Sequence, residues 1–159
     1  MKKDHTALLT GHRKIDVADL SPLSKLLDLV IERLIIQGVI FWGCGGGLGF
    51  DQLAGFAVIK LREKYPAVRL IMVLPCHGQD IYWHDKEKED YYRLLAVADK
   101  IVYVSEYFDK DCMARRNLHL VEHSRFCVAY MKHGMSGTSQ TVRMSRERGL
   151  TIINLADLL

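Results

Sequence analysis

Long apolar runs and paired cysteine motifs are absent from this 159-residue sequence. The opening stretch, MKKDHTALLTGHR, holds an apolar segment too short for a signal-peptide core, and no other segment approaches the roughly 20 residues of a membrane span. The four cysteines form no C-x-x-C motif, and most of them lie in or beside apolar runs, as reduced buried thiols do. They are Cys44, Cys76, Cys112 and Cys127. We therefore expect a soluble protein of the reducing cytoplasm, with no membrane partner.

A strong excess of one charge is also absent. Lysine and arginine number 22 against 19 acidic residues, which gives a formal net charge of +3 and a pI near 8.7. A dedicated nucleic-acid-binding protein carries a denser basic surface, so nucleic acid is not the favoured partner. With 49% hydrophobic residues the chain can bury a core without disulfides or metal. We expect one domain over residues 1–159, and the oligomeric state stays open, a homo-oligomer included.

Short apolar segments alternate with longer stretches of helical periodicity. The apolar segments are residues 7–10, 39–42, 70–74, 101–104, 126–130 and 151–155. Unbroken apolar segments of this length are typical of strands that are buried on both faces. Between them, apolar residues recur every three or four positions, as at Leu23 and Leu27, and this spacing predicts helices. The three prolines, Pro22, Pro66 and Pro75, are expected at element edges. The alternation predicts a doubly wound α/β fold: a mostly parallel sheet of about six strands with helices on both faces.

The sequence after the second predicted strand, GCGGGLGFD at residues 43–51, is unusually rich in glycine. Glycines let backbone amides approach a ligand, and the helix that follows directs its positive end to the same point, so we expect a phosphate there. The loop lacks the Lys-Ser/Thr of a Walker motif, and no G-x-G-x-x-G fits it. These absences disfavour an ATPase and an ordinary NAD dehydrogenase. The alternative is a tight strand-to-helix turn that binds nothing.

Polar residues follow the other predicted strands, at the sheet edge where doubly wound folds bind ligands. His12 and Arg13 follow the first strand, and we expect Arg13 to contact phosphate rather than to pair with a surface acid. Asp51 would be repelled by phosphate, so we expect it to cap the helix, with a hydrogen bond to ribose hydroxyls as the alternative. Trp83 either stacks on a base or packs on its own loop, two interpretations that the sequence does not separate.

Five segments carry a family resemblance. They are TGHR at 10–13, GGLGFDQLA at 46–54, LPCHGQDIYW at 74–83, ADKIVYVSEYFDKDCMARRN at 98–117 and SGTSQTVRMSRERGLTIINL at 136–155. Together they resemble the YpsA-like branch of the SLOG superfamily, whose other members include DprA/Smf and the LOG proteins. The resemblance implies a Rossmann-like domain with a pocket for a nucleotide-derived, ADP-ribose-like ligand, but it implies no reaction and no certain cofactor. We expect the pocket to be formed by Gly11, His12, Arg13, Gly45, Gly46, Gly47, Gly49, Asp51, Gln79, Trp83, Arg116, Asn117, Ser136, Gly137 and Thr138.

Departures from the related branches separate the functional alternatives. LOG-type phosphoribohydrolases carry P-G-G-x-G-T-x-x-E, and the Glu of this motif falls on Thr141 here. The sequence therefore lacks the carboxylate that the phosphoribohydrolase activity needs. Another hydrolase of nucleotide bonds would need Asp51, His12 or Glu106 as its acid or base. Single-stranded DNA binding of the DprA type is a further alternative, although the sequence shows no evident stacking series along a basic groove. The favoured hypothesis is a ligand-binding protein without turnover, and catalytic residues stay unassigned.

One further motif, H-x-x-E-H, is formed by His119, Glu122 and His123. It matches the signature of one class of zinc protease, with both histidines on one helical face. A catalytic zinc needs a third protein ligand, and the acids in the remaining sequence are Glu147 and Asp157. We therefore expect no metal here.

Overall fold

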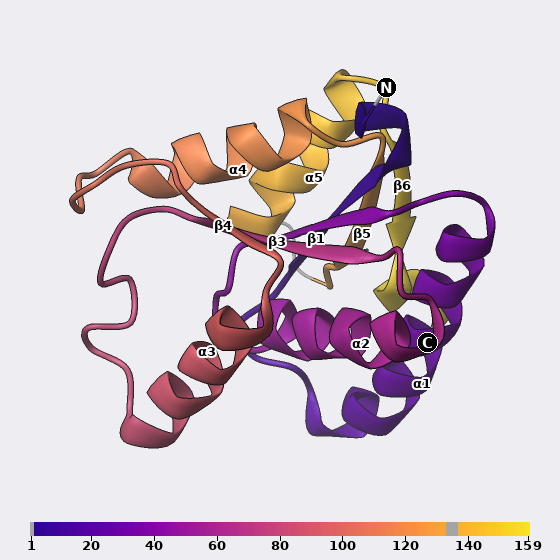
Figure 1. Ribbon diagram of the computed structural model, residues 1–159, viewed down its shortest axis with the longest axis horizontal. Helices are drawn as coiled ribbons and strands as arrows, with labels where there is room; N and C mark the ends of the chain where they lie inside the picture. The colour runs from indigo at the N-terminus through magenta and orange to yellow at the C-terminus, as the bar shows by residue number, and fades with distance from the viewer. Residues whose placement is uncertain (1, 133–136) are drawn as a thin grey trace.

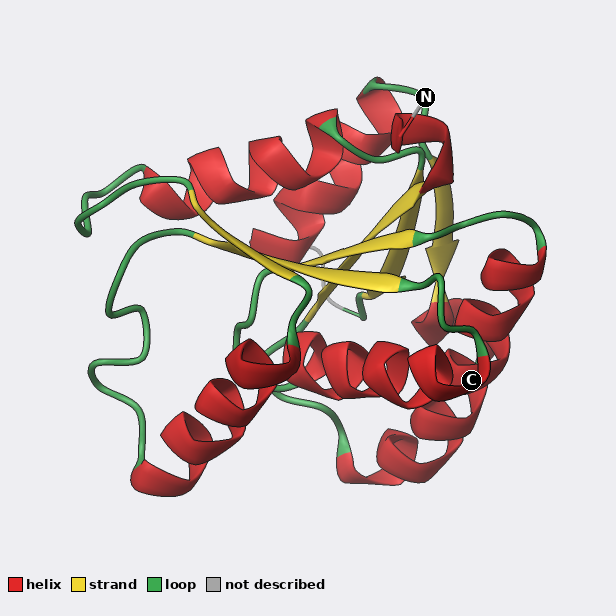
Figure 2. Ribbon diagram, in the orientation of Figure 1, coloured by secondary structure: helices red, strands yellow, loops and turns green. Residues whose placement is uncertain are grey.

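A computed structural model describes residues 2–132 and 137–159 and contains a six-stranded sheet in which every neighbouring pair is parallel (Figures 1 and 2). The strands are β1 (Thr6–Gly11), β2 (Phe41–Cys44), β3 (Arg69–Leu74), β4 (Lys100–Tyr103), β5 (Phe126–Tyr130) and β6 (Thr151–Asn154). The α-helices are α1 (Val17–Ile36), α2 (Phe50–Lys64), α3 (Asp85–Val97), α4 (Cys112–Glu122) and α5 (Gly137–Glu147). Two short 3-10 helices, η1 (Lys2–His5) and η2 (Leu155–Leu158), lie near the ends of the chain.

The helices form two layers. In Figure 1, α1, α2 and α3 cover one face of the sheet, while α4 and α5 cover the other. The prediction of a doubly wound α/β fold is therefore confirmed. The strand order is β4-β3-β2-β1-β5-β6, so the chain moves outward from β1 to β4 and then returns to place β5 on the other side of β1. This reversal beside β1 is the place where such sheets leave a crevice at their carboxyl ends.

The core has one part on each side of the sheet. Trp42, Phe50 and Leu74 belong to the larger part, beneath α1, α2 and α3, and all three are fully buried. Leu8 and Cys127 belong to the smaller part, beneath α4 and α5. Because β1 and β5 are covered on both faces, their sequences are almost continuously apolar. Among the described helices, none combines the length and apolarity that crossing a bilayer would require.

Several strand bounds differ from those expected by one residue, and two differences are larger. The second strand runs to Cys44 rather than to Trp42, because Gly43 and Cys44 pair with both β1 and β3. Pro22 lies inside α1 rather than at its edge, because the helix begins at Val17, where the Asp19 amide donates to the Asp16 carbonyl at 2.8 Å.

The loops after β1 and β2 pack against each other through a glycine. Gly49 has a φ of 77°, and a Cβ atom added there would lie 2.0 Å from the Arg13 carbonyl oxygen. The next residue, Phe50, donates its amide to the His12 carbonyl at 3.1 Å. The start of α2 is thus fixed against the residues that follow β1, which brings two predicted ligand-binding segments together.

We expect Gly49→Ala to destabilise the protein by about 3 kcal/mol or more, since it adds overpacking to the cost of a left-handed backbone. Gly149→Ala is the matched control, because Gly149 has a φ of 78° but no atom within 4 Å of the added Cβ. That variant should lose only about 1–2 kcal/mol. Urea unfolding of both variants measures the difference. Equal losses would contradict the close packing at Gly49.

Candidate functional site

A cavity of about 410 Å³ lies at the carboxyl edge of the sheet, beside the point where the strand order reverses. Its wall combines the end of β1, the loop after β2, the first turn of α2, one side of α4 and the start of α5. The predicted site residues that line it are Gly11, His12, Arg13, Gly47, Asp51, Gln79, Arg116, Asn117, Gly137 and Thr138. Segments that follow four different strands, β1, β2, β3 and β5, therefore meet at one cavity.

Arg116 lies buried between α4 and the glycine-rich loop. Its Nη1 donates to the Gly45 carbonyl oxygen at 2.8 Å, and its Nε donates to Asn117 Oδ1 at 2.8 Å. A Cβ atom at Gly45 would lie 2.4 Å from Nη1, so only glycine lets the guanidinium come this close. Arg115 is instead exposed and pairs with Asp109 at 2.5 Å. Of the two adjacent arginines, Arg116 is the one that faces the cavity.

Gln79 reaches the same loop from the segment after β3. Its Nε2 donates to the Gly45 carbonyl at 3.1 Å and to the Tyr91 hydroxyl at 3.0 Å. Trp83 does not line the cavity, and its ring packs edge-on against Tyr91 at a centroid distance of 5.2 Å. Trp83 thus packs on α3, which is neither of the two arrangements that we considered for it.

Asp51 does not cap α2. The N-cap residue is Gly49, so the expected capping role of Asp51 is wrong. The Asp51 carboxylate instead turns back to the loop, where Oδ2 accepts a hydrogen bond from the Gly47 amide at 3.2 Å. Its Oδ1 is buried and has no hydrogen bond of ordinary geometry with the rest of the described chain. Asp51 lines the cavity, but this oxygen atom has no exposed surface there.

The ionisation of Asp51 is held between opposing effects. Burial raises its pKa to about 6, while Arg116, the backbone amides of Gly47 and Gly11, and Arg13 act in the opposite direction. Burial disfavours the charged carboxylate more than these groups stabilise it. Asp51 therefore exchanges its proton near neutral pH, unlike an ordinary surface aspartate.

Arg13 is the exposed cation of the site. It lines the cavity and forms no ion pair with any residue in 2–132 or 137–159. The surface ion pair weighed as an alternative is therefore not seen within these ranges. Together with the buried Arg116, Arg13 gives the cavity lining two positive charges, and both oppose the rise in the Asp51 pKa.

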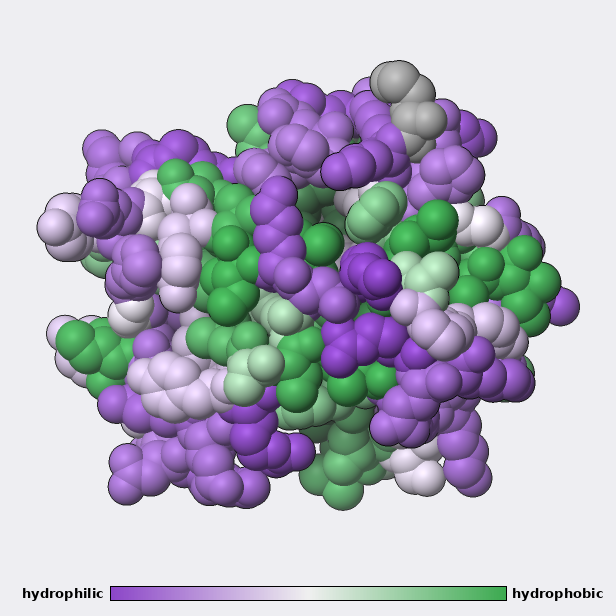
Figure 3. Space-filling model, viewed as in Figure 1, coloured by the Kyte–Doolittle hydropathy of each residue, from purple (hydrophilic) through white to green (hydrophobic). Residues whose placement is uncertain are grey.

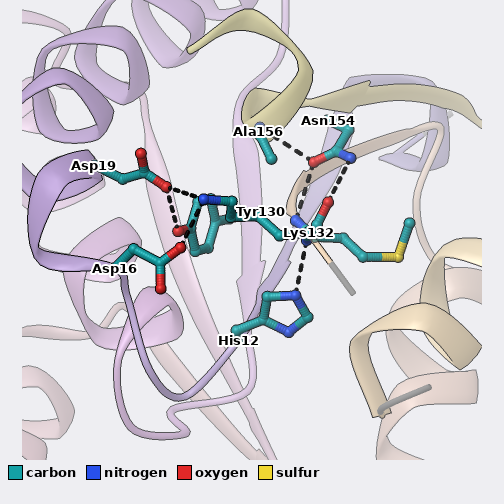
Figure 4. A network of polar contacts seen from close by, with 8 residues as sticks. His12, Asp16, Asp19, Tyr130, Lys132, Asn154 and Ala156 are labelled. Carbon is teal, nitrogen blue, oxygen red and sulfur yellow. Dashed lines mark hydrogen bonds and ion pairs between the residues drawn. The ribbon is translucent and has the colours of Figure 1, made fainter. Parts of the chain in front are cut away.

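A polar network holds the loop after β1 against the loop after β5 (Figure 4). The His12 Nε2 accepts a hydrogen bond from the Lys132 amide at 2.8 Å, an arrangement in which Nδ1 carries the hydrogen of the neutral ring. The Lys132 ammonium contacts Asp16 at 2.6 Å and Asp19 at 3.0 Å. The Tyr130 hydroxyl also donates to Asp19 at 2.8 Å, and these donors lower the pKa of Asp19.

Asn154 extends the network to β6. Its Oδ1 accepts from the amides of Met131 and Ala156, and its Nδ2 donates to the Met131 carbonyl at 2.9 Å (Figure 4). Met131 is therefore held against β6 at the point where the chain leaves β5. The residues from Tyr130 to Lys132 support the cavity wall, yet they carry no motif that would have revealed this role.

The start of α5 completes the cavity. Gly137 and Thr138 line it, whereas the predicted residue Ser136 lies outside the described residues. Thr141, which stands where LOG-type enzymes have their glutamate, is buried, and its hydroxyl donates to the Gly137 carbonyl at 3.0 Å. Thr141 thus stabilises the first turn of α5.

The glycine-rich loop serves mainly the protein's own packing. Gly47 lines the cavity, but Gly45, Gly46 and Gly49 do not. Gly46 has a φ of 73°, and a Cβ atom there would lie 3.0 Å from side-chain atoms of Met72 and Tyr91. Met113 and Leu120 of α4 supply apolar wall residues that we did not predict, because nothing in sequence periodicity separates a cavity wall from the core.

Comparison with known proteins identifies the family. A family model described as the YspA SLOG family matches residues 7–148, so the chain belongs to that family. The resemblance to the YpsA-like branch is thereby confirmed.

Two curated relatives carry no functional description in their names. The Bacillus subtilis (strain 168) uncharacterized SPbeta prophage-derived protein YoqJ is 30% identical over 135 residues, which cover 77% of this chain and 79% of that protein. UPF0398 protein RBAM_020340 of Bacillus velezensis is 30% identical over 89 residues, or 56% of this chain. The matched part spans only 49% of the length of that second relative.

A solved structure shares the fold. DNA processing protein A from Helicobacter pylori, described for its single-stranded DNA binding mode, superposes with a TM-score of 0.66 at 18% identity. The superposition covers 94% of this chain and 64% of that one. At this identity the likeness concerns the fold.

The H-x-x-E-H residues lie at the end of α4, away from this cavity. The rings of His119 and His123 stack at 4.1 Å rather than converging on a point, and His123 Nδ1 bonds the His119 carbonyl at 2.7 Å. Within the described chain, no group of three or more histidine, cysteine or acidic residues could hold a metal ion.

We predict that the protein purified after growth with zinc carries no stoichiometric zinc, because a structural or catalytic site needs a third protein ligand. Elemental analysis of the protein and of a His119→Ala/His123→Ala double variant measures this. One zinc per chain, lost in the double variant, would show the prediction to be wrong.

Asp51→Asn should stabilise the ligand-free protein at pH 7.5. The folded pKa of Asp51, about 6, lies above its unfolded value of 3.8, so ionisation of the wild-type residue reduces stability progressively as the pH rises from 4 through 6. The gain should be at most about 3 kcal/mol at pH 7.5 and well under about 1 kcal/mol at pH 4. Urea unfolding at both pH values measures it, with Asp157→Asn at an exposed site as the control. A gain that does not depend on pH would contradict the raised pKa.

Proposed function

We propose that the chain binds a nucleotide or nucleotide-derived ligand, of the ADP-ribose kind, in the carboxyl-edge cavity. The observation that carries the proposal is the meeting of Arg13, Arg116, the N-terminal end of α5 and the Asp51 carboxylate around one cavity. A volume of about 410 Å³ lies within the range of small-molecule sites. Membership of a SLOG family supports a nucleotide-related role in general.

Phosphate groups belong on the Arg13 side of the cavity. Arg13 is exposed and unpaired within the described chain, so it can form charge-assisted hydrogen bonds without breaking an existing ion pair. The N-terminal end of α5 at Gly137 and Thr138 adds free amides and the positive end of the helix dipole. A cation and a helix terminus that face one space are a common basis for phosphate binding.

Sugar hydroxyls belong beside Asp51. Asp51 lines the cavity, and its carboxylate can accept a hydrogen bond that a diphosphate group does not offer at neutral pH. A ribose hydroxyl can donate such a bond, and hydrogen bonds to a charged acceptor are the stronger ones. The lining therefore combines groups suited to anions with a group suited to hydroxyls, as a nucleotide requires.

A hydrolase acting on a nucleotide-derived substrate is the second candidate. The observation that favours it is the raised pKa of Asp51, about 6, which suits a general acid or base near neutral pH. Incubation of the protein with ADP-ribose, NAD and AMP, followed by chromatography, separates this candidate from simple binding. Product formation that Asp51→Asn abolishes would favour hydrolysis.

Single-stranded DNA binding is the third candidate, and it rests on the shared fold with a protein described as binding single-stranded DNA. Binding to a DNA backbone weakens steeply with salt, because phosphate contacts release counterions. An oligonucleotide titration at two salt concentrations tests it. Of the two arginines that line the cavity, Arg116 is buried, so it is not available to the backbone of a continuous strand.

Arg13→Ala should weaken binding of the best ligand by roughly 1.5–3 kcal/mol, the value of a charge-assisted hydrogen bond. Calorimetry against ADP-ribose, NAD, AMP and cyclic nucleotides measures this. Lys14→Ala is the matched control, because Lys14 is exposed next to Arg13 but does not line the cavity. A ligand that binds both variants and the wild type equally would exclude the phosphate role of Arg13.

Gly47→Val should block the ligand while leaving the fold intact. Gly47 lines the cavity and has no positive φ, and an added Cβ would meet only the Asp51 carboxylate, at 3.1 Å. Gly46→Val is a poorer test, because its backbone conformation and its contacts with Met72 and Tyr91 would destabilise the fold. Unchanged affinity in folded Gly47→Val protein would mean that the loop is only a turn.

A further inference from the structure

A second cavity, also of about 410 Å³, lies on the α4 face of the sheet near the amino-terminal halves of the strands. Its floor is apolar and is formed by Phe41, Ile71, Val73, Val102 and Leu120. Leu120 also belongs to the wall of the carboxyl-edge cavity, and no other described residue lines both. Figure 3 shows apolar residues across the middle of one side of the molecule, between the helical layers seen in Figure 1.

The rim of this second cavity is positively charged. Lys2 and Lys3 of η1 and Lys100 of β4 line it, and none of them forms an ion pair with another described residue. The one acid among its described lining residues, Glu122, already pairs with Arg148 at 3.4 Å. Three lysines without ion-pair partners in the described chain therefore line the cavity beside its apolar floor, and the Lys2 ammonium lies 5.6 Å from the centre of the Phe41 ring.

His119 adds a polar group that lacks a partner. Its Nδ1 atom is buried and forms no hydrogen bond with the described chain. His123 also lines the cavity, but its Nδ1 already bonds the His119 carbonyl. Because this atom has no exposed surface, the lysines and the apolar floor, rather than His119, are the groups that can recognise a ligand here.

We propose that this cavity binds a small amphipathic anion, an apolar body that carries one carboxylate, sulfate or phosphate group. The body covers the floor of Ile71, Val73 and Val102, and the acidic group lies among the three lysines. A purely apolar ligand would leave the lysines unused, and the stacked rings of His119 and His123 do not converge on a metal ion. This inference is independent of the proposed nucleotide site.

The first test uses octanoate, octan-1-ol and octylammonium, which share an apolar chain and differ in charge. Amide chemical shifts of the ¹⁵N-labelled protein report both affinity and position. We expect octanoate to shift the amides of Ile71, Val73 and Val102 and to bind about tenfold or more tightly than octan-1-ol, with octylammonium weaker still. Equal binding of octanoate and octan-1-ol, or no shift of these amides up to the solubility limit, would overturn the proposal.

The second test changes the rim and the floor separately. Lys100→Glu and, in a separate variant, Lys2→Glu/Lys3→Glu should weaken the binding of octanoate by about tenfold. Both variants should leave the binding of octan-1-ol unchanged. Lys86→Glu is the control, because it makes the same change of charge at an exposed position of α3. Val102→Trp should fill the cavity and abolish the binding of both ligands, and circular dichroism checks that the variant is folded. If the rim variants bind octanoate as the Lys86→Glu control does, the charge argument fails.

Discussion

The contact between the Arg116 guanidinium and the Gly45 carbonyl is the interaction on which the carboxyl edge of the sheet depends. A buried cation is tolerated only where hydrogen bonds and an opposite charge compensate for lost hydration. Here Gly45 and Asn117 accept hydrogen bonds from Arg116. The positive charge of Arg116 also acts against the rise in the Asp51 pKa that burial causes. The arginine belongs to α4 on one face of the sheet, while Asp51 belongs to α2 on the other. One side chain therefore couples the two helical layers at the cavity.

This constraint explains the composition of the glycine-rich loop. Gly45 makes room for the guanidinium, and Gly49 makes room for the carbonyl of Arg13. Neither residue lines the cavity, although both fix the segments that do. The run of glycines reflects close internal packing first and access to a ligand at Gly47 second. The number of glycines in such a strand-to-helix turn therefore does not indicate how many backbone amides face a phosphate.

The sequence predicted what depends on periodicity and missed what depends on distant contacts. The strand at 126–130 has the expected bounds because its apolar segment is buried on both faces. The capping role of Asp51 failed because burial beside Arg116 outweighed the ordinary preference of aspartate for an N-cap. The bond from the Lys132 amide to His12 joins residues 120 positions apart, and no local pattern reveals such a pair.

A phosphate group and a sugar hydroxyl would change the pKa of Asp51 in opposite directions. A phosphate placed against its carboxylate would raise the pKa further, since a second negative charge disfavours ionisation. A hydroxyl that donates to the carboxylate would lower the pKa, because a hydrogen bond to the charged form stabilises it. The direction in which the Asp51 pKa moves when a ligand binds therefore distinguishes a phosphate from a hydroxyl at this wall. A pKa of about 6 in the free protein leaves room for a measurable shift in either direction.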